Sequence, residues 1–266
     1  MPVETNIQIN PIQQEEFHAI DKVIMGEAFD IHNTMGRFFD ERIYQEELAQ
    51  RCRERGFEAH RELQLRVTHQ DFSKSYFIDM LIERGVIYEL KAAETLTLNH
   101  ENQLITYLLL ADMNHGKLIN FRPSSVQTRF VSTRLSHADR TQFQLVHDLK
   151  AGAHGHTHKL REILAALLAD WGAFLDIGLY REAILHFLTG PGTGICPIEI
   201  IRGNRVVGTQ HMCMLDQDMA WHISAVRRNT RSYEKHIVRL LNHTSLSEML
   251  WINMNHLTIT LKTLKK

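Results

Sequence analysis

Two short apolar segments, residues 76–82 and 86–92, carry three charged side chains at positions where a charge is costly. Asp79 lies in the first segment, and Glu89 and Lys91 lie in the second. A carboxylate inside an apolar strand needs compensation by a paired charge or a metal ion. A tight turn between the segments predicts a hairpin in which Asp79 falls opposite Glu89. Two facing carboxylates beside an ammonium group could hold a divalent cation and support the hydrolysis of phosphodiester bonds.

The spacing of these residues resembles the signature of a known superfamily. Asp79 followed by Glu89-Leu90-Lys91 matches the D…(D/E)xK pattern of the PD-(D/E)XK nuclease-like superfamily. The resemblance extends to an ordered series made up of Gly26 to His32, Gly36, Glu41, Tyr44, Glu46, Leu48, His100-Glu101, Gln103 to Leu108 and Leu118 to Phe121. Over residues 15–135 this series resembles the bacterial GxxExxY group of that superfamily. The chain departs from the group at Phe38, which stands where the glycine that names the motif is expected.

The resemblance implies a metal-dependent active site that uses Mg²⁺ or Mn²⁺. The implied ligands are Asp79, Glu89, the backbone carbonyl of Leu90, and Glu41 either directly or through water. Lys91 would orient or deprotonate the attacking water and offset the charge that develops on the phosphate. Gln103, on a predicted helix, would steady the metal-bound water or a phosphate. A buried salt bridge across the hairpin would explain the same residues without a metal, and Glu41 could also be a solvated residue near a helix N-terminus.

The composition is that of an ordinary globular protein. The 266 residues are 44% apolar and 23% charged, and the formal net charge is −1. The sequence contains neither a long apolar segment nor a signal-peptide pattern, so we expect a cytoplasmic protein without a membrane partner. Three widely spaced cysteines argue against a disulfide framework or a thiolate zinc site. The near-neutral charge does not indicate nucleic-acid binding, which would need a local basic groove.

The elements predicted around the hairpin follow the order of a mixed α/β fold. Apolar residues at helical spacing predict helices over residues 15–35, 41–55 and 99–110. Strands are predicted over residues 60–68, 117–121 and 126–135, in addition to the hairpin. Residues 1–11 are polar, and we expect them to be frayed. The resemblance implies that these elements form a restriction-endonuclease-like fold, a mixed central sheet flanked by helices.

The second half of the chain is similar to the first. Residues 171–184 align with residues 35–48, which places Gly172 at Gly36 and Tyr180 at Tyr44. Further predicted elements are strands over 198–201, 210–215 and 220–226, a helix over 233–241, and a segment at 251–254 that resembles 118–121. We interpret this pattern as an internal repeat, which predicts tandem lobes over residues 1–138 and 139–266.

The second lobe lacks the charged residues of the first. The best alignment puts Cys213 at Asp79, Ile223 at Glu89 and Ala225 at Lys91, and a shift by one residue restores no acid-x-Lys triple. We therefore expect a degenerate lobe without catalytic residues. It could imitate the partner subunit of a dimeric nuclease, so that the chain forms an intramolecular pseudo-dimer; a homo-oligomer is the other possibility.

Two further groups of residues could bind ligands. The most basic stretch consists of Arg227, Arg228, Arg231, Lys235 and Arg239, which could contact nucleic-acid phosphates or form a solvated face. His154, His156 and His158 alternate, and on an extended strand they could converge on zinc or nickel. The chain has 17 histidines, so such clusters also arise by chance.

The leading hypothesis is a metal-dependent nuclease that hydrolyses phosphodiester bonds, with DNA as the favoured substrate. The alternative is a non-catalytic nucleic-acid-binding or scaffold protein that retains a nuclease-like fold. The carboxylates separate the two, because only the enzyme needs them for a metal. The sequence contains no base-reading motif, so we expect no sequence specificity.

Overall fold

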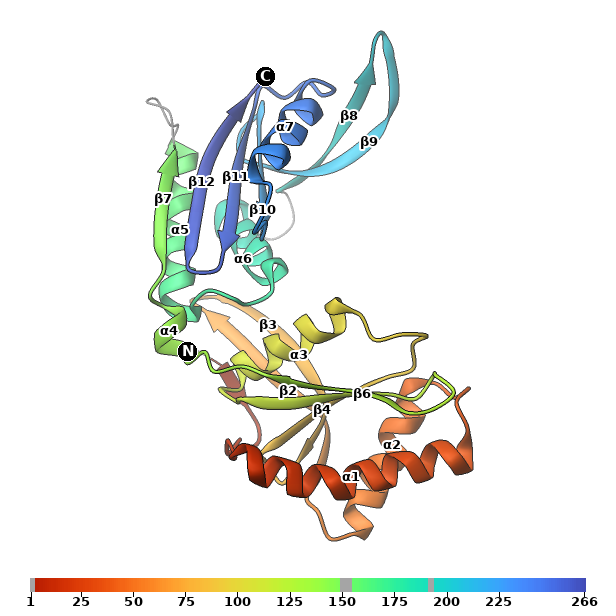
Figure 1. Ribbon diagram of the computed structural model, residues 1–266. Helices are drawn as coiled ribbons and strands as arrows, with labels where there is room; N and C mark the ends of the chain where they lie inside the picture. Colours follow the sequence, from red (N-terminus) through yellow and green to blue (C-terminus); the bar gives the residue numbers. More distant parts are fainter. Residues whose placement is uncertain (1–2, 149–154, 191–193) are drawn as a thin grey trace. The chain divides into compact units, whose positions relative to one another are not determined.

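The computed structural model describes residues 3–148, 155–190 and 194–266. The chain divides after His137 into two compact units, and each contains one six-stranded mixed sheet (Figure 1). The predicted fold class, α/β with two mixed sheets flanked by helices, is confirmed. No helix in the described ranges is both long enough and apolar enough to cross a membrane.

The first unit has its strands in sequence order across the sheet. The helices are α1 (Gln14–Met35), α2 (Glu41–Glu54) and α3 (Leu98–Leu110), and the strands are β1 (Val3–Thr5), β2 (Ala59–His69), β3 (Phe72–Ile82), β4 (Val86–Lys91), β5 (His115–Asn120) and β6 (Gln127–Ser132). All neighbouring strands are antiparallel except β4 and β5, which α3 connects. The expectation that residues 1–11 are frayed is wrong for Val3–Thr5, because β1 pairs with β2.

The layers of the first unit determine which side chains of β4 face the core. Helices α1 and α2 cover one face of the sheet and α3 covers the other (Figure 1). Tyr88 and Leu90 are fully buried in the cluster beneath α1 and α2, together with Phe17 and Ile24. Because side chains alternate along a strand, the intervening Glu89 and Lys91 point to the α3 side.

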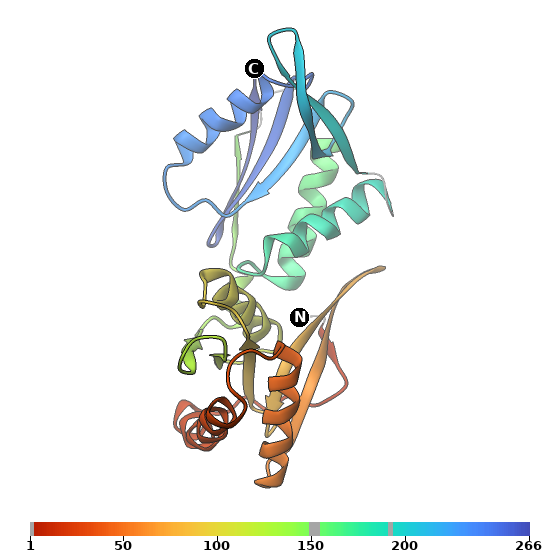
Figure 2. The same cartoon turned by 90° about the vertical axis from the view of Figure 1, so that its right-hand side faces the viewer.

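The second unit repeats this arrangement of elements. After the short helix α4 (His137–Arg140), it contains β7 (Gln144–Asp148), α5 (Gly155–Trp171), α6 (Ile177–Thr189), β8 (Ile195–Arg202), β9 (Arg205–Met214), β10 (Met219–Ser224), α7 (Thr230–Leu241), β11 (Glu248–Asn255) and β12 (Thr258–Lys265). The sheet order is β7-β12-β11-β10-β9-β8, with β10 and β11 parallel. Helices α5 and α6 lie on one face and α7 on the other (Figure 2). Among the described strands, each unit has one without a counterpart in the other unit, and the two lie at opposite edges of their sheets: β1 beside β2, and β7 beside β12.

The glycine–tyrosine pair that the sequence alignment matched has the same geometry in both units. Gly36 and Gly172 follow α1 and α5 with φ of 80° and 75°, a backbone conformation that favours glycine. The hydroxyl of Tyr44 donates to the carbonyl of Gly36 at 2.8 Å, and the hydroxyl of Tyr180 donates to the carbonyl of Gly172. Both tyrosines are fully buried. The pair therefore fixes the turn between the first two helices of each unit.

A buried asparagine joins two parallel strands in each unit, and we call this contact the asparagine bridge. Asn120 accepts the N–H of Ala93 at 3.0 Å and donates to its carbonyl at 2.7 Å. Asn253 does the same with Val226, at 2.8 Å and 3.0 Å. The bridge satisfies the main chain just beyond β4 and β10, where the ladder ends.

The asparagine bridge corrects the alignment of the second unit. Lys91 lies beside Asn120, and Ser224 lies beside Asn253. The residues at the positions of Asp79, Glu89 and Lys91 are therefore Met212, His222 and Ser224, so the predicted Cys213, Ile223 and Ala225 are each wrong by one residue. Most side chains of β10 are buried on both faces, so its apolar pattern does not determine the register.

Candidate active site

The hairpin of β3 and β4 brings the two acidic residues together. Glu83 and Arg84 at the turn have φ of 49° and 56°, and the N–H of Gly85 closes the turn by donating to the carbonyl of Ile82 at 3.0 Å. The register places Asp79 opposite Glu89, one step beyond the last paired residues. There the Asp79 carboxylate accepts the N–H of Leu90 at 2.8 Å, so a side chain takes over where main-chain pairing ends. Asp79 and Glu89 therefore lie opposite each other, as predicted from the sequence.

Glu89 is the more deeply buried of the two carboxylates. Its side chain is 1% exposed, whereas that of Asp79 is 16% exposed. One oxygen, Glu89 Oε2, is buried and has no hydrogen-bond partner within the described ranges. A buried carboxylate oxygen without a partner is unfavourable, so this atom needs a ligand or a proton.

Lys91 lies among three carboxylates. Its ammonium donates to Glu89 Oε1 at 2.7 Å and lies 3.5 Å from Glu41 Oε1 and 3.8 Å from Asp79 Oδ2. Glu41, the first residue of α2, also accepts the N–H of Ala92 at 3.2 Å through Oε2. Four of the five predicted catalytic residues therefore form one cluster, built from β3, β4 and the start of α2.

The cluster disfavours full ionisation of its acids. Burial raises the pKa of Asp79 to about 6 despite the nearby charge of Lys91. Burial, with the charge of Asp79 second, raises the pKa of Glu89 to about 8. Burial would lower the pKa of Lys91, but Glu89 and Asp79 outweigh it and raise this pKa. The acidic pair therefore retains a proton near neutral pH unless a further positive charge is added.

The fifth predicted residue, Gln103, lies on α3 and is hydrogen-bonded to a tyrosine. Gln103 Nε2 donates to the Tyr107 hydroxyl at 2.8 Å, so the two share a face of α3 as predicted. Burial, followed by the charge of Glu89, raises the pKa of Tyr107 to about 12, so its phenol stays protonated. His100 instead accepts the N–H of Thr97 at 3.2 Å at the start of α3.

The residues fit a divalent cation in two respects. The unpartnered Glu89 Oε2 could accept a bond from a metal ion, and a cation would stabilise the ionised form of both acids, which burial disfavours. Across the described residues, no three Asp, Glu, His or Cys side chains are arranged as a metal-binding group. In the cluster, the Lys91 ammonium lies among the acids and supplies the compensating charge.

One cationic side chain at this site was not predicted from the sequence. Arg122 donates from Nε to the carbonyl of Ala92 at 3.3 Å and from Nη2 to the carbonyl of Phe39 at 3.4 Å. These contacts hold a guanidinium group beside the end of β4 and the loop before α2. A planar guanidinium suits phosphate recognition. In the sequence, the feature that could have identified Arg122 is its position directly after the segment 118–121.

The predicted nucleic-acid-binding residues are exposed. Arg231, Lys235 and Arg239 are four residues apart and share one face of α7, and Arg227 and Arg228 precede this helix. We call these five residues the basic face. Glu234, which could have balanced them, pairs with Lys262 at 3.2 Å. The role of the basic face in binding stays a prediction.

The histidine cluster does not have the expected geometry. His154 lies outside the described residues. His156 and His158 lie in α5, not in a strand, and approach Asp216 and Glu162 respectively at 3.4 Å. Two residues two positions apart on a helix point in different directions, so these histidines do not converge.

Comparison with known proteins identifies a similarity in the first unit. Residues 18–131 match the model of a family described as the PD-(D/E)XK nuclease superfamily. The matched segment contains all five predicted catalytic residues. No curated protein and no solved structure matches the chain. Over these residues the first unit is similar to that superfamily.

Proposed function

We propose that this chain is a divalent-metal-dependent nuclease that hydrolyses phosphodiester bonds, with DNA as the favoured substrate. The convergence of Asp79, Glu89 and Lys91 at the open end of the β3–β4 hairpin is the observation that supports this most strongly. The three lie inside the segment that matches the nuclease superfamily. The ordered series with Glu41 and Tyr44 supports placement in the GxxExxY group.

The proposed roles follow from the contacts of each side chain. Asp79, Glu89, the Leu90 carbonyl and Glu41 would hold Mg²⁺ or Mn²⁺. The bound ion would polarise the scissile phosphate and lower the pKa of the attacking water. The N–H of Leu90 fixes the Asp79 carboxylate, which limits its loss of conformational freedom on binding.

The positively charged side chains would stabilise the negative charge of the substrate. Lys91, which donates to Glu89 in the structure, would orient the attacking water and offset negative charge on the transferring phosphate. Arg122 would contact a phosphate beside the end of β4, and Gln103 would steady a water or phosphate through its contact with Tyr107. A fixed network of this kind lowers the reorganisation needed during reaction.

For the second unit we propose a degenerate copy of the same fold that contributes substrate binding. Its support is the shared Gly–Tyr pair and asparagine bridge, combined with Met212, His222 and Ser224 at the positions of the acids and the lysine. The two units would then form an intramolecular pseudo-dimer. The basic face would contact the backbone of the nucleic acid.

The test is a titration of Mg²⁺ and Mn²⁺ with single- and double-stranded DNA and RNA as substrates. Wild type is expected to cleave only with metal. Lys91→Met should lose at least about 10²-fold in cleavage rate, the usual effect of removing a group that assists proton transfer, while metal still stabilises the protein. Lys22→Met, an exposed lysine on α1, is the matched control and should cleave like wild type. Cleavage that persists in Lys91→Met would refute the proposed role.

The non-catalytic alternative has one observation in its favour. The Lys91 ammonium already compensates the carboxylates, as it would in a salt-bridge cluster without metal. Under this alternative, Mg²⁺ and Mn²⁺ would leave the thermal stability of wild type unchanged, and no substrate would be cleaved. Nucleic-acid binding without metal binding would support the scaffold function.

A further inference from the structure

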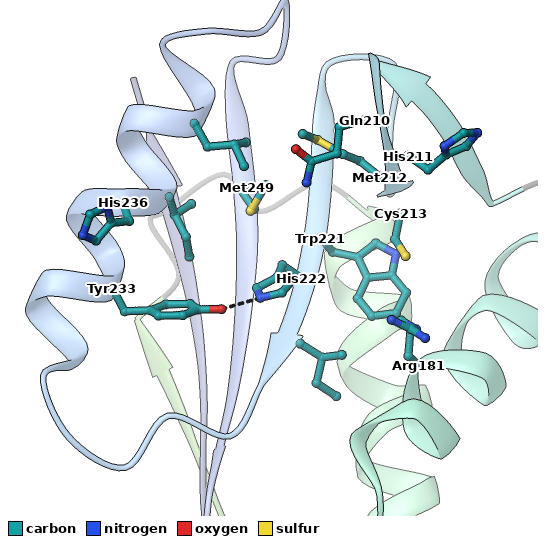
Figure 3. A pocket seen from close by; sticks show the side chains of 13 residues that line it. Arg181, Gln210, His211, Met212, Cys213, Trp221, His222, Tyr233, His236 and Met249 are labelled. Carbon is teal, nitrogen blue, oxygen red and sulfur yellow. Dashed lines mark hydrogen bonds between the residues drawn. The ribbon is translucent and has the colours of Figure 1, made fainter. Parts of the chain in front are cut away.

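The second unit has a pocket of about 370 Å³ at the place that corresponds to the carboxylate cluster of the first (Figure 3). Strands β9 and β10 pair at only two positions, Met214 with Ala220 and Cys213 with Trp221. The pocket opens where this pairing ends. Met212 and His222, at the positions of Asp79 and Glu89, both line it. The pocket therefore includes the positions that the two acids occupy in the first unit.

The polar groups of the pocket favour an anion. Its lining includes Arg181 from α6 and, among the described residues, no Asp or Glu. Arg181 is exposed, so its guanidinium is accessible to a ligand. Burial and then the positive charge of Arg181 lower the pKa of His222, which belongs to the same lining. A cation without a neighbouring acid in the lining is a ready partner for a phosphate.

A buried donor in the pocket also needs an acceptor. Trp221 is 2% exposed, and its indole N–H has no hydrogen-bond partner within the described part of the chain. In Figure 3 the indole lies between Cys213 and the guanidinium of Arg181. An indole nitrogen can only donate, and leaving it buried and unpaired costs about 1–3 kcal/mol. An acceptor oxygen on a ligand would remove this cost.

One wall of the pocket presents aromatic rings. His222 and Tyr233 are joined by a 2.6 Å hydrogen bond and stack at 6.0 Å between ring centroids (Figure 3). Tyr233 in turn stacks on Trp251 at 5.3 Å, which fixes its ring. A rigid aromatic surface of this kind is suited to a nucleobase, because every base has a π-face.

We propose that this pocket binds a single nucleotide across the gap where β9 and β10 separate, with the phosphate at Arg181 and Trp221 on the α6 side and the base against His222 and Tyr233 on the α7 side. The volume lies at the lower end of the range for small-molecule sites, as a single nucleotide requires. The ligand is either a free mononucleotide or the terminal nucleotide of a strand, which share this chemistry. The site goes beyond the proposed nuclease centre and does not need its carboxylates.

Tryptophan fluorescence of the full chain tests the proposal. All three tryptophans, Trp171, Trp221 and Trp251, belong to the second unit, so the signal reports on this unit alone. Adenosine 5′-monophosphate and its deoxy form, titrated in EDTA, are expected to cause a saturable change. Adenosine and inorganic phosphate should bind at least tenfold more weakly, since each has only part of the recognised chemistry. Tighter binding of a 5′- or 3′-phosphorylated oligonucleotide would identify a strand end as the ligand.

Three variants make the test specific. Arg181→Gln should weaken nucleotide binding at least tenfold, and Arg205→Gln, an exposed arginine outside the pocket, should not. Trp221→Phe keeps an aromatic ring but loses the N–H, and calorimetry should show weaker binding. Glu89→Gln should bind nucleotide like wild type, so failure of the nuclease proposal would not affect this result. No saturable change with any nucleotide or oligonucleotide, or equal binding by wild type and Arg181→Gln, would overturn the proposal.

Discussion

Replacing Glu89 by glutamine should stabilise the metal-free protein at alkaline pH, although it removes a charged contact with Lys91. The pKa of Glu89 is raised in the folded protein, so the folded protein holds the proton more tightly than the unfolded chain does. The resulting stability is complete below pH 4.5 and is lost as the pH rises toward about 8. Glutamine carries no titrating proton and removes this loss.

The magnitude follows from the pKa. Each pH unit above the usual value of 4.5 costs about 1.4 kcal/mol while Glu89 stays protonated when folded, which gives about 3 kcal/mol at pH 7. For a unit of this size that corresponds to about 10 °C in Tm. Lys91 keeps Asp79 and Glu41 as neighbours in the variant, so its own charge stays compensated.

Scanning calorimetry at pH 5 and pH 8, with EDTA or excess Mg²⁺, measures the effect. In EDTA the variant should match wild type at pH 5 and exceed it at pH 8, and Mg²⁺ should raise the Tm of wild type alone. The tryptophan fluorescence transition, which reports the second unit, serves as an internal reference and should not change. If the variant were less stable at pH 8 by the 3–5 kcal/mol typical of a broken buried ion pair, the reasoning from burial would be refuted.

Two further predictions concern the asparagine bridge and the basic face. Asn120→Ala should destabilise the first unit and Asn253→Ala the second, each by about 2 kcal/mol, because each variant leaves a main-chain N–H and a carbonyl unpaired. Calorimetry measures the loss of stability, and tryptophan fluorescence shows whether the second unit is the one affected. Replacing Arg231, Lys235 and Arg239 together by alanine should weaken nucleic-acid binding uniformly across sequences and lower the slope of log K against log salt by up to about 3; an unchanged slope would exclude the basic face from the interface.

The sequence predicted the elements that carry strong periodic patterns. The structure agrees with the expectation for α1, α2, the β3–β4 hairpin and the cluster of Asp79, Glu89 and Lys91. Charged residues in apolar strands determine both the register of the hairpin and the face of the sheet to which each side chain points. The Gly36 and Tyr44 correspondence with Gly172 and Tyr180 was also readable, since a left-handed glycine and a buried tyrosine have few substitutes.

The remaining features depend on contacts between distant parts of the chain. The strand β1 was missed because its three residues gain their order only by pairing with β2. The register of β10 was wrong by one residue because its apolar side chains fill both faces, and only the bond of Asn253 to Val226 identifies the correct one. The pocket at Arg181 gave no motif, because its residues come from five separate elements, α6, β9, β10, α7 and β11.

Because of the asparagine bridge, the residues that stabilise the fold are different from the residues that could do the chemistry. Because it holds the strand end through main-chain atoms, the side chains at positions 89 and 91, or 222 and 224, can change without releasing the strand. A mutation that abolishes the proposed cleavage would then leave a normally folded molecule of normal abundance. In a cell such a molecule would persist as a competitor for the same ligands instead of being cleared by proteases.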